Sequence, residues 1–488
     1  MKLYSKIMLA VALAVLVPVS GCKKALDVNQ NPNVVNNVTA DLLLPSIEVF
    51  IANTLGVNFQ IYGGIWGQYW TQNPNSSQYR EIERYQPTAP DFDRPWTNLY
   101  AGAGSDLREL EALAVANHQQ QYQAIALLLR AYMFQMITDA WGDVPYTEAL
   151  RGAPEDGGIV NPRYDPQAEV YNNIIALVDQ GLSLIDVADP SAPGSDDLIF
   201  GGDMSMWEKF GNTLKLRMLL RLAYVDPGKA QAGIAALNGA SFLDIGEDAH
   251  VSYTASSPNP LYAEMVGNRR TQNLVASSTA IDSMNSNDDP RIGVFYEPTS
   301  TGVYAGIKQG NFNTTVPAGS YSIPSPNVGG DAQNDASATA PVKLLTGYES
   351  KFLQAEAVAR GWLGGSSSAQ TLFEEGIFAN FESWGLSDSA AMDYIANSYW
   401  GMYPSGGSLN AQIRHIITQK WFSMAGNQCF EAWTEWRRTG YPDFFIMSEE
   451  AIINSFPVRF LYPDLEITRN FNFPGTKAVT DRVWWDVN

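Results

Sequence analysis

Residues 124–137 read AIALLLRAYMFQMI, and this stretch decides the fold class. Apolar side chains recur at helical spacing along it, at Ile125, Leu128, Leu129, Tyr132 and Met136. Nearly every other face is apolar as well, and a helix that is hydrophobic all round is buried by neighbours on several sides. The stretch therefore predicts a central helix that ends at residues 141–145, WGDVP, where glycine and proline break it.

Amphipathic stretches beyond this segment predict further helices. They cover residues 168–185, 207–224, 348–363, 369–384 and 409–424. A short GGSSS turn at 364–368 separates the third from the fourth. Two helices around a short loop, recurring along the chain, resemble tetratricopeptide-type hairpins. We expect a mainly α fold, in which a tetratricopeptide-like helical hairpin scaffold carries a loop-rich lobe.

Two long segments lack helical periodicity. Residues 53–95 are dense in Gly, Gln, Asn, Tyr and Trp, and residues 297–341 are rich in Gly, Ser, Thr, Asn and Pro. We expect both to be loop-rich insertions in a body that spans 39–488 and whose first helix is capped by Thr39 or Asp41. Loops longer than about 12–15 residues are usually functional or disordered. The aromatic residues inside 297–341 favour a function, and surface packing is the alternative.

The first residues of the chain predict export. Lys2 and Lys6 precede the apolar run 7–17, which is about half of the ~20 residues that span a bilayer. The run ends in Val19-Ser20-Gly21-Cys22, which resembles a bacterial lipobox. We predict a signal peptide over 1–21, a lipid anchor on Cys22 and a lipidated polar leader over 22–38. The alternative is an ordinary signal peptide with an incidental cysteine.

Composition excludes several classes of function. The formal net charge is −20 over 488 residues, which argues against nucleic acid and against an electrostatic grip on anionic lipid. No later segment looks long and apolar enough to span a membrane, since 124–137 contains Arg130 and Gln135. If Cys22 is acylated, Cys429 has no cysteine partner and reads as a small buried residue.

The common catalytic motifs are missing from the sequence. Its three histidines, His118, His250 and His415, do not lie at metal-binding helical spacing, and no phosphate loop or G-x-S-x-G elbow occurs. A pair of carboxylates, as glycosidases use, stays open because sequence spacing does not constrain it. We expect no catalytic residue, no metal and no cofactor.

Several blocks in sequence order resemble the SusD/RagB family of outer-membrane nutrient-binding lipoproteins. They are LDVN at 26–29 with NPN at 31–33, DAWGDVPYTEA at 139–149, EAWTEWRRTGYP at 431–442, and YP at 462–463. The blocks themselves are read as structure. In the longest one, Glu435 and Arg438 stand at i, i+3 spacing and predict an ion pair within a helix.

The resemblance implies a binding protein and not an enzyme. Such proteins sit on the outer face of the outer membrane, cap a SusC-like TonB-dependent transporter, and deliver oligosaccharides or, in some members, peptides. A peptide-binding RagB-like subunit is therefore the alternative function, and a lipid-anchored polysaccharide hydrolase is a third. Lys23 and Lys24 depart from the family, in which acidic residues often follow the lipidated cysteine.

Ligand residues are predicted from composition and placement. A sugar needs a flat apolar surface for its C–H face and polar groups for its hydroxyls. The stretch 66–85 offers both, although Trp66 and Tyr69 are expected to pack inward, and a second group is expected to face it. The predicted ligand-binding residues are Trp70, Tyr79, Arg80 and Tyr85 in the first group, and Tyr262, Arg269, Tyr296 and Tyr304 in the second.

Overall fold

The apolar stretch at 124–137 forms the middle of helix α7 (Gln120–Trp141) in the computed structural model, which describes residues 38–488. Its side chains are buried because α6 (Ser105–Ala116) and α8 (Gln167–Leu184) pack against the helix. Gly142 ends it at φ +82°, a conformation that glycine adopts without strain. The predicted central helix is confirmed. The predicted signal peptide and Cys22 lie outside the described residues.

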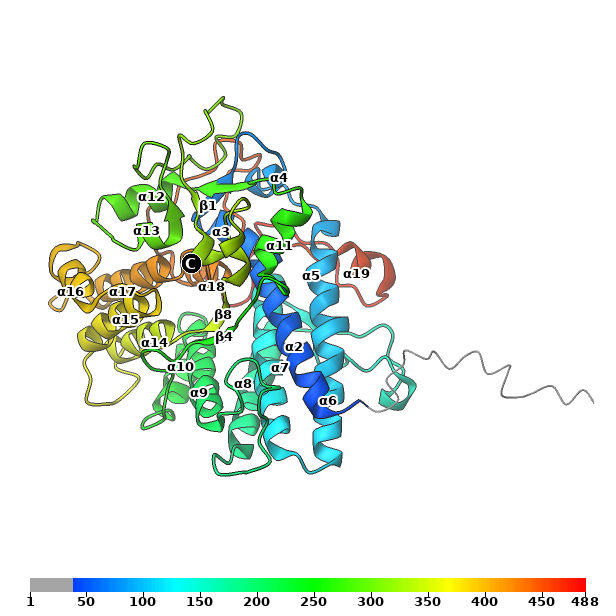
Figure 1. Ribbon diagram of the computed structural model, residues 1–488. Coiled ribbons are helices and arrows are strands. Elements are labelled where there is room, and N and C mark those ends of the chain that lie inside the picture. The colour runs from blue at the N-terminus through cyan, green and yellow to red at the C-terminus, as the bar shows by residue number, and fades with distance from the viewer. Residues whose placement is uncertain (1–37) are drawn as a thin grey trace, which may run out of the picture. The chain divides into compact units, whose positions relative to one another are not determined.

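Further helices pack one on the next beyond α8, to the left of α7 in Figure 1. α8 packs on α9 (Met204–Arg221), and α9 packs on α10 (Pro227–Ala235). Later in the chain, α14 (Gly347–Ala359) packs on both α15 (Ala369–Ser383) and α17 (Leu409–Ser423), while α16 (Asp388–Asn397) packs on α15. The mainly α, tetratricopeptide-like scaffold is confirmed, and the helices fall within a few residues of the predicted bounds.

Most of these helices are capped at the N-terminus by a side-chain oxygen. Each accepts a hydrogen bond from a backbone N–H of the first turn, which has no partner inside the helix. The capping residues are Asp203 for α9, Asp226 for α10, Thr346 for α14, Ser368 for α15, Ser387 for α16 and Ser408 for α17.

The predicted irregular structure at 53–66 is wrong. Helix α2 (Ala40–Thr54) continues through a π-helical turn, η2 (Leu55–Phe59), into α3 (Gln60–Trp66). Every residue of α3 is buried, and α18 (Cys429–Thr439) packs against it. A helix surrounded on all sides has no polar face, so its sequence shows no helical period.

The same continuous helix also corrects the expectation that no later segment is long and apolar enough to span a membrane. Residues 40–66 are long and apolar enough to span a membrane by length and composition alone. In the structure they are a core element, with Leu44, Ile47 and Ile51 fully buried. The carboxyl group of Glu48 is buried among them and accepts the backbone N–H of Leu198 at 2.7 Å.

The structure also has short antiparallel strand pairs, and the loop-rich part around β1, α4 (Arg80–Glu83), α11 (Pro260–Gly267) and α12 (Ser278–Asn285) lies in the upper part of Figure 1. The pairs are β1 (Trp70–Gln72) with β5 (Leu274–Ala276), β2 (Val144–Pro145) with β3 (Tyr164–Asp165), β4 (Ala249–Val251) with β8 (Val342–Leu345), and β6 (Tyr296–Glu297) with β7 (Ile323–Pro324).

The remaining helices are short. They are α4 (Arg80–Glu83), η3 (Ala89–Phe92), α5 (Asp93–Thr97), η4 (Asn98–Gly104), η5 (Pro154–Asp156), α11 (Pro260–Gly267), α12 (Ser278–Asn285), α13 (Ile292–Phe295), η6 (Pro326–Val328), η7 (Asp335–Thr339) and α19 (Asp464–Arg469). The segment 297–341 is irregular apart from β7, η6 and η7, and its Phe312 and Tyr321 are buried.

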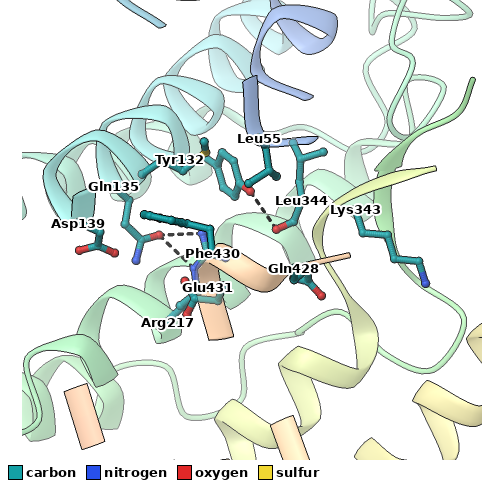
Figure 2. A pocket seen from close by; sticks show the side chains of 11 residues that line it. Leu55, Tyr132, Gln135, Asp139, Arg217, Lys343, Leu344, Gln428, Phe430 and Glu431 are labelled. Carbon is teal, nitrogen blue, oxygen red and sulfur yellow. Dashed lines mark hydrogen bonds between the residues drawn. The ribbon is translucent and has the colours of Figure 1, made fainter. Parts of the chain in front are cut away.

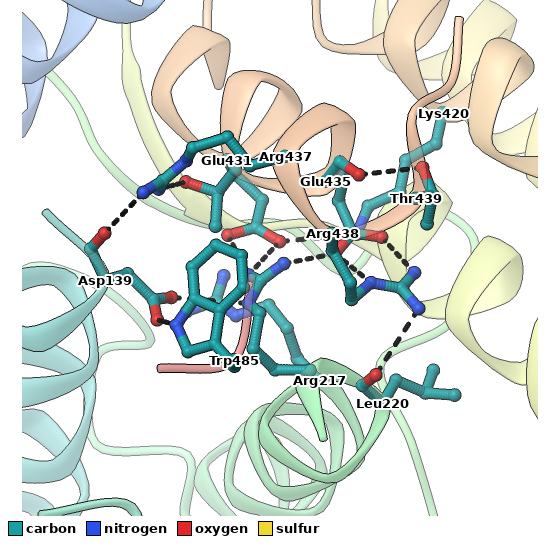
Figure 3. A network of polar contacts seen from close by, with 12 residues as sticks. Asp139, Arg217, Leu220, Lys420, Glu431, Glu435, Arg437, Arg438, Thr439 and Trp485 are labelled. Atoms are coloured by element: carbon teal, nitrogen blue, oxygen red, sulfur yellow. Dashed lines mark hydrogen bonds and ion pairs between the residues drawn. The ribbon is translucent and has the colours of Figure 1, made fainter. Parts of the chain in front are cut away.

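A buried ionic network, shown in Figure 3, joins the scaffold around α18. Arg438 pairs with Glu435 at 2.6 Å, which confirms the predicted i, i+3 ion pair, and with Glu356 at 2.6 Å. Arg221 on α9 pairs with Glu431 at 2.7 Å and with Glu435. Burial raises the pKa of Glu435, but the charges of Arg438, Lys420 and Arg221 outweigh it and hold that pKa well below its ordinary value.

Candidate functional site

Most of the aromatic rings predicted to contact a ligand are buried. Trp70, Tyr79, Tyr85, Tyr262 and Tyr296 each expose 8% of their surface or less. Trp70 lies in β1 against the backbone of Gly64, and the Tyr296 hydroxyl donates to the backbone carbonyl of Tyr69 at 3.1 Å. None of these five rings stands open to a ligand in this structure, and their role in ligand binding stays a prediction.

The other three predicted residues keep some exposure. The half-buried Arg80 guanidinium lies over the ring of Phe312 at 5.1 Å, and its Nε donates to the carbonyl of Ser76 at 3.2 Å. Tyr304 is half-buried beside α13. Arg269 is exposed. Arg269 is thus the member of the predicted set whose side chain is most accessible.

Arg269 stands at a strained turn that follows α11. Its φ is +61° and that of Arg270 is +55°, in the left-handed region that residues with a Cβ rarely adopt. The Arg270 guanidinium donates to Asp335 at 2.8 Å and lies over the ring of Tyr262, whose hydroxyl also donates to Asp335. These contacts fix the turn. Strain of this kind persists where the surrounding structure holds it, often at ligand sites.

Two adjoining cavities lie beside this turn. One has a volume of about 350 Å³ and the other about 380 Å³, and both are lined by Gly267 and Asn268. We name the pair the polar groove. Its other lining residues are Asn53, Val57, Asn58, Arg94, Asn98, Pro258, Pro260, Ala263 and Glu264 in the first cavity, and Asn75, Ser76, Ser77, Gln78, Arg269, Thr271 and Asn273 in the second.

Strand pairing brings the two sides of the second cavity together. β1 runs antiparallel to β5, so Gln72 faces Leu274. Directly beyond the strands, Asn73 donates its backbone N–H to the carbonyl of Asn273 at 2.8 Å and its side-chain amide to that of Gln272 at 2.7 Å. The strand pair thus places the segment 272–276 beside 70–73, and the expectation that the second predicted group of side chains faces the first stays a prediction.

Glu83 supports the loop that forms one wall of the groove. Its fully buried carboxylate accepts the Gln72 backbone N–H at 2.8 Å and the Thr71 hydroxyl. Burial raises the pKa of Glu83 to about 7, against the lowering effect of these hydrogen bonds. Glu83 therefore holds the strand residues just before the loop 73–78 through hydrogen bonds, and the charge of its carboxyl group depends on pH.

The charged residues of the groove lining are few: Arg94, Arg269 and Glu264. Arg94 and Glu264 form an ion pair at 3.0 Å in the first cavity. The buried hydroxyl of Tyr79 has no hydrogen-bond partner among the described residues. Burial, and then the charge of Glu264, raise the pKa of Tyr79. Glu264 is the one carboxylate in the lining, and the lining includes no aromatic side chain.

The lining is suited to hydrogen bonding with neutral groups. Asparagine and glutamine amides each offer two donor hydrogens and an acceptor oxygen, and serine hydroxyls do both. An Asn-Pro-Asn-Ser-Ser-Gln run at 73–78 supplies much of one wall. The run lies within the stretch 66–85 that the sequence predicts as the ligand segment, and its composition is typical of a turn on the surface.

An enclosed cavity in the core, shown in Figure 2, is a different kind of space. Its volume is about 10 Å³, room for a single water molecule. Around it, Arg217 donates to Gln135 at 2.8 Å and the Tyr132 hydroxyl donates to the Leu344 carbonyl at 3.0 Å. It belongs to the packing of the scaffold. Within residues 38–488, no group of three or more metal-ligating side chains is arranged around a common point.

Comparison with known proteins places the chain. Residues 32–463 match the SusD-like family model described as "Starch-binding associating with outer membrane". No curated protein matches the sequence. A solved chitin-binding protein is similar in fold, with a TM-score of 0.76 at 24% identity over 91% of this chain and 100% of its own.

Two further structures share the fold. A SusD homologue from Bacteroides uniformis has a TM-score of 0.77 at 24% identity, over 91% of this chain and 99% of its own. A chitin-binding SusD homologue from Flavobacterium johnsoniae has a TM-score of 0.73 at 22% identity, over 91% of this chain and 99% of its own. Since the family model covers most of the sequence and the helical architecture agrees, the chain belongs to the SusD-like family of outer-membrane-associated proteins.

Proposed function

We propose that this protein binds an oligosaccharide in the polar groove and passes it to a SusC-like TonB-dependent transporter for uptake. The observation that carries the proposal is the groove itself, two joined cavities of about 350 and 380 Å³ lined mainly by amides and hydroxyls. Their combined size lies in the range of ligand sites, and their donors and acceptors complement sugar hydroxyls. The family description, starch binding, points to the same class of ligand.

We assign no catalytic role to the groove. Hydrolysis of a glycosidic bond by the usual route needs two carboxyl groups, roughly 5–10 Å apart, on either side of the bond. Glu264 is the single carboxylate of the lining, and Arg94 pairs with it. A bound glycan is therefore expected to leave the groove uncleaved.

A peptide is the second candidate ligand. The groove lining has no aromatic platform for a sugar ring, and its asparagines offer the paired donors and acceptors that an extended peptide backbone uses. This observation favours a RagB-like peptide-binding subunit over a hydrolase.

Attachment to the cell surface rests on the N-terminal sequence. On this proposal Cys22 carries the lipid anchor at the outer face of the outer membrane, and the described body rests on the transporter. Each acyl methylene buried in lipid contributes about 0.8 kcal/mol, so several chains hold the protein firmly. Mass spectrometry of the membrane-extracted protein tests the acylation, and co-purification of a barrel protein tests the partner.

Calorimetric titration tests the ligand class. The full-length protein, in a detergent without a sugar headgroup, is titrated with starch- and chitin-derived oligosaccharides and with peptides, and each mixture is assayed for products. Saturable binding of an oligosaccharide without turnover supports the proposal. Binding of peptides alone selects the second candidate, and turnover overturns both.

A matched pair of variants assigns the binding to the groove. Asn268→Trp places a large ring where the two cavities meet, so we expect at least a tenfold loss of affinity. Asn397→Trp is the control, because Asn397, like Asn268, ends a helix and donates its amide to the carboxylate four residues earlier. Equal affinities in the two variants would contradict the assignment to the groove.

A further inference from the structure

The two cavities of the polar groove differ in charge. In the first cavity, Arg94 and Glu264 neutralise each other through their ion pair at 3.0 Å. In the second cavity, Arg269 is the one charged residue of the lining, and no carboxylate lines that cavity. The side chain of Arg269 is exposed and has no ion-pair partner among the described residues. The lining of the second cavity therefore carries a positive charge that no group of the protein in that lining offsets.

The acidic residues that contact this turn already have arginine partners. Glu264 pairs with Arg94, and Asp335 accepts from Arg270 at 2.8 Å and from the hydroxyl of Tyr262. Each of the two carboxylates is thus matched by one guanidinium. Arg269 is the cation that remains.

Arg80 adds a second positive charge beside the other wall of this cavity. Its Nε donates to the carbonyl of Ser76, which lines the second cavity, at 3.2 Å. The guanidinium lies over the ring of Phe312 at 5.1 Å and has no carboxylate partner within residues 38–488. Arg84, one turn further along the chain, differs because it pairs with Glu81 at 3.2 Å. Each wall of the second cavity is therefore accompanied by an arginine without an ion pair.

Uncharged hydrogen-bonding groups complete the second cavity. Ser77, Gln78 and Thr271 belong to its lining, and all three are exposed. Hydroxyl and amide groups both donate and accept hydrogen bonds, so they can bind the hydroxyls of a sugar, whereas a guanidinium only donates. The lining is thus suited to a ligand that carries both hydroxyl groups and an anionic group.

From this arrangement we propose that the second cavity binds the carboxylate of a uronic acid through Arg269, so that the groove prefers acidic oligosaccharides to neutral ones. The planar guanidinium offers parallel N–H donors that match the two oxygens of a carboxylate. The hydroxyls of the same sugar hydrogen-bond with Ser77, Gln78 and Thr271, and the neighbouring sugar lies in the first cavity. The inference rests on the oligosaccharide binding proposed above and specifies the class of oligosaccharide.

The net charge of −20 does not oppose this preference at the site itself. At physiological ionic strength, charges farther away than about 8 Å are largely screened, so the groups beside the ligand decide the local attraction. A neutral sugar in the second cavity leaves the guanidinium of Arg269 to water. A carboxylate in the same place gains a charge-assisted contact and meets no carboxylate in the lining of that cavity.

Calorimetric titration with matched probes tests the preference. The full-length protein is titrated with starch- and chitin-derived oligosaccharides and with the same oligosaccharides after oxidation of their C6 hydroxyls to carboxylates. The oxidised member of a pair should bind about fivefold more tightly, as expected for one exposed ion pair. High ionic strength should remove this preference, because salt screens an exposed ion pair, and should leave the affinity of the neutral member unchanged.

A matched pair of variants assigns the preference to Arg269. Arg269→Gln removes the charge and keeps a polar side chain, so the oxidised and neutral oligosaccharides should bind with equal affinity. Arg469→Gln is the control, because Arg469 is also exposed at the end of a helix, α19, has no ion pair among the described residues and does not line the groove. It should keep the full preference for the oxidised oligosaccharides.

The outcomes separate this inference from the proposed function. Equal affinities for neutral and oxidised oligosaccharides in the unmodified protein would overturn the inference and leave oligosaccharide binding intact. If no oligosaccharide binds, the proposed function fails and the inference fails with it. A preference that persists in Arg269→Gln or disappears in Arg469→Gln would contradict the role of Arg269. Tighter binding of acidic peptides than of every oxidised oligosaccharide would contradict the assignment to a sugar.

Discussion

Arg438 in the ionic network and Arg94 in the polar groove carry the same guanidinium in opposite settings. Arg438 is fully buried and binds two carboxylates, Glu356 and Glu435, through two nitrogens each. Arg94 has 59% of its side chain exposed and pairs with one carboxylate, Glu264. The first joins helices that are far apart in sequence, and the second lies where a ligand can reach it.

The difference separates residues that keep the fold from residues that are free to bind. Around α18, Arg221, Arg438, Glu431 and Glu435 are paired with countercharges, because a buried ion without a partner is very unfavourable. In the groove most polar groups are neutral amides, which water can satisfy until a ligand replaces it. Family motifs in the first region therefore report on the scaffold, and ligand preference must be sought in the second.

The largest effect is expected from Arg438→Met. It leaves Glu356 and Glu435 buried with fewer countercharges, so the free energy of unfolding should fall by about 5 kcal/mol, the upper end for a broken buried pair. Denaturant titration measures it. Arg414→Met is the control, because Arg414 makes a similar two-nitrogen contact with Asp443 on the surface and should lose less than about 1 kcal/mol. Similar losses of unfolding free energy in both variants would contradict the proposed difference between the buried network and surface ion pairs.

Trp70→Ala tests whether a predicted platform residue belongs to the core. Removal of a fully buried indole should lower the free energy of unfolding by about 3–4 kcal/mol. Trp484→Ala, at a partly exposed tryptophan, should cost much less. Oligosaccharide affinity per folded molecule should stay the same in both. If Trp70→Ala lost affinity without losing stability, Trp70 would be a ligand-binding residue and not a core residue.

Glu83 gives the wall of the groove a pH dependence. Its folded pKa of about 7 lies above the ordinary value of 4.5, so its contribution is fully present below pH 4.5 and is lost as the pH rises through 7. Between pH 5 and 8 the unmodified protein should lose roughly 2.5 kcal/mol of stability relative to Glu83→Gln. Thermal or denaturant unfolding of both proteins across this range measures the difference. Parallel curves would show that Glu83 does not titrate there.

The smallest effect is expected from Arg94→Ala. Loss of the exposed pair with Glu264 should change stability by about 0–1 kcal/mol, and added salt should remove the difference. Unfolding at low and high ionic strength is the measurement. A loss as large as that of Arg438→Met would mean that the groove is part of the scaffold.

Helices with one apolar face could be predicted from the sequence to within a few residues. The bounds of α15 and α17 agree because Ser368 and Ser408 cap them and a glycine-rich turn precedes each cap. The continuation of α2 into α3 could not, because a helix buried on all sides resembles an irregular apolar segment. The ion pair of Glu435 with Arg438 followed from local spacing, whereas their contacts with Glu356 and Arg221 needed the tertiary fold.

The candidate site was less predictable for a physical reason. Tyrosine and tryptophan serve equally well in a core and at a ligand surface, so their density near 66–85 did not distinguish the two. Strand pairing between β1 and β5 decides which residues meet, and no local pattern specifies it. Arg269, predicted from composition and placement, lines the second cavity beside Asn268, and its role in ligand binding stays a prediction.

Trp485 donates its indole N–H to Asp139 at 2.8 Å and is fully buried, so a residue three positions from the end of this sequence closes a core that begins near residue 40. A contact between residues hundreds of positions apart cannot form until the later of the two has been synthesised. The core of the described body is therefore incomplete until Trp485 has been synthesised. If the predicted signal peptide directs export, such late closure keeps the polypeptide unfolded and able to cross a membrane before it folds on the far side.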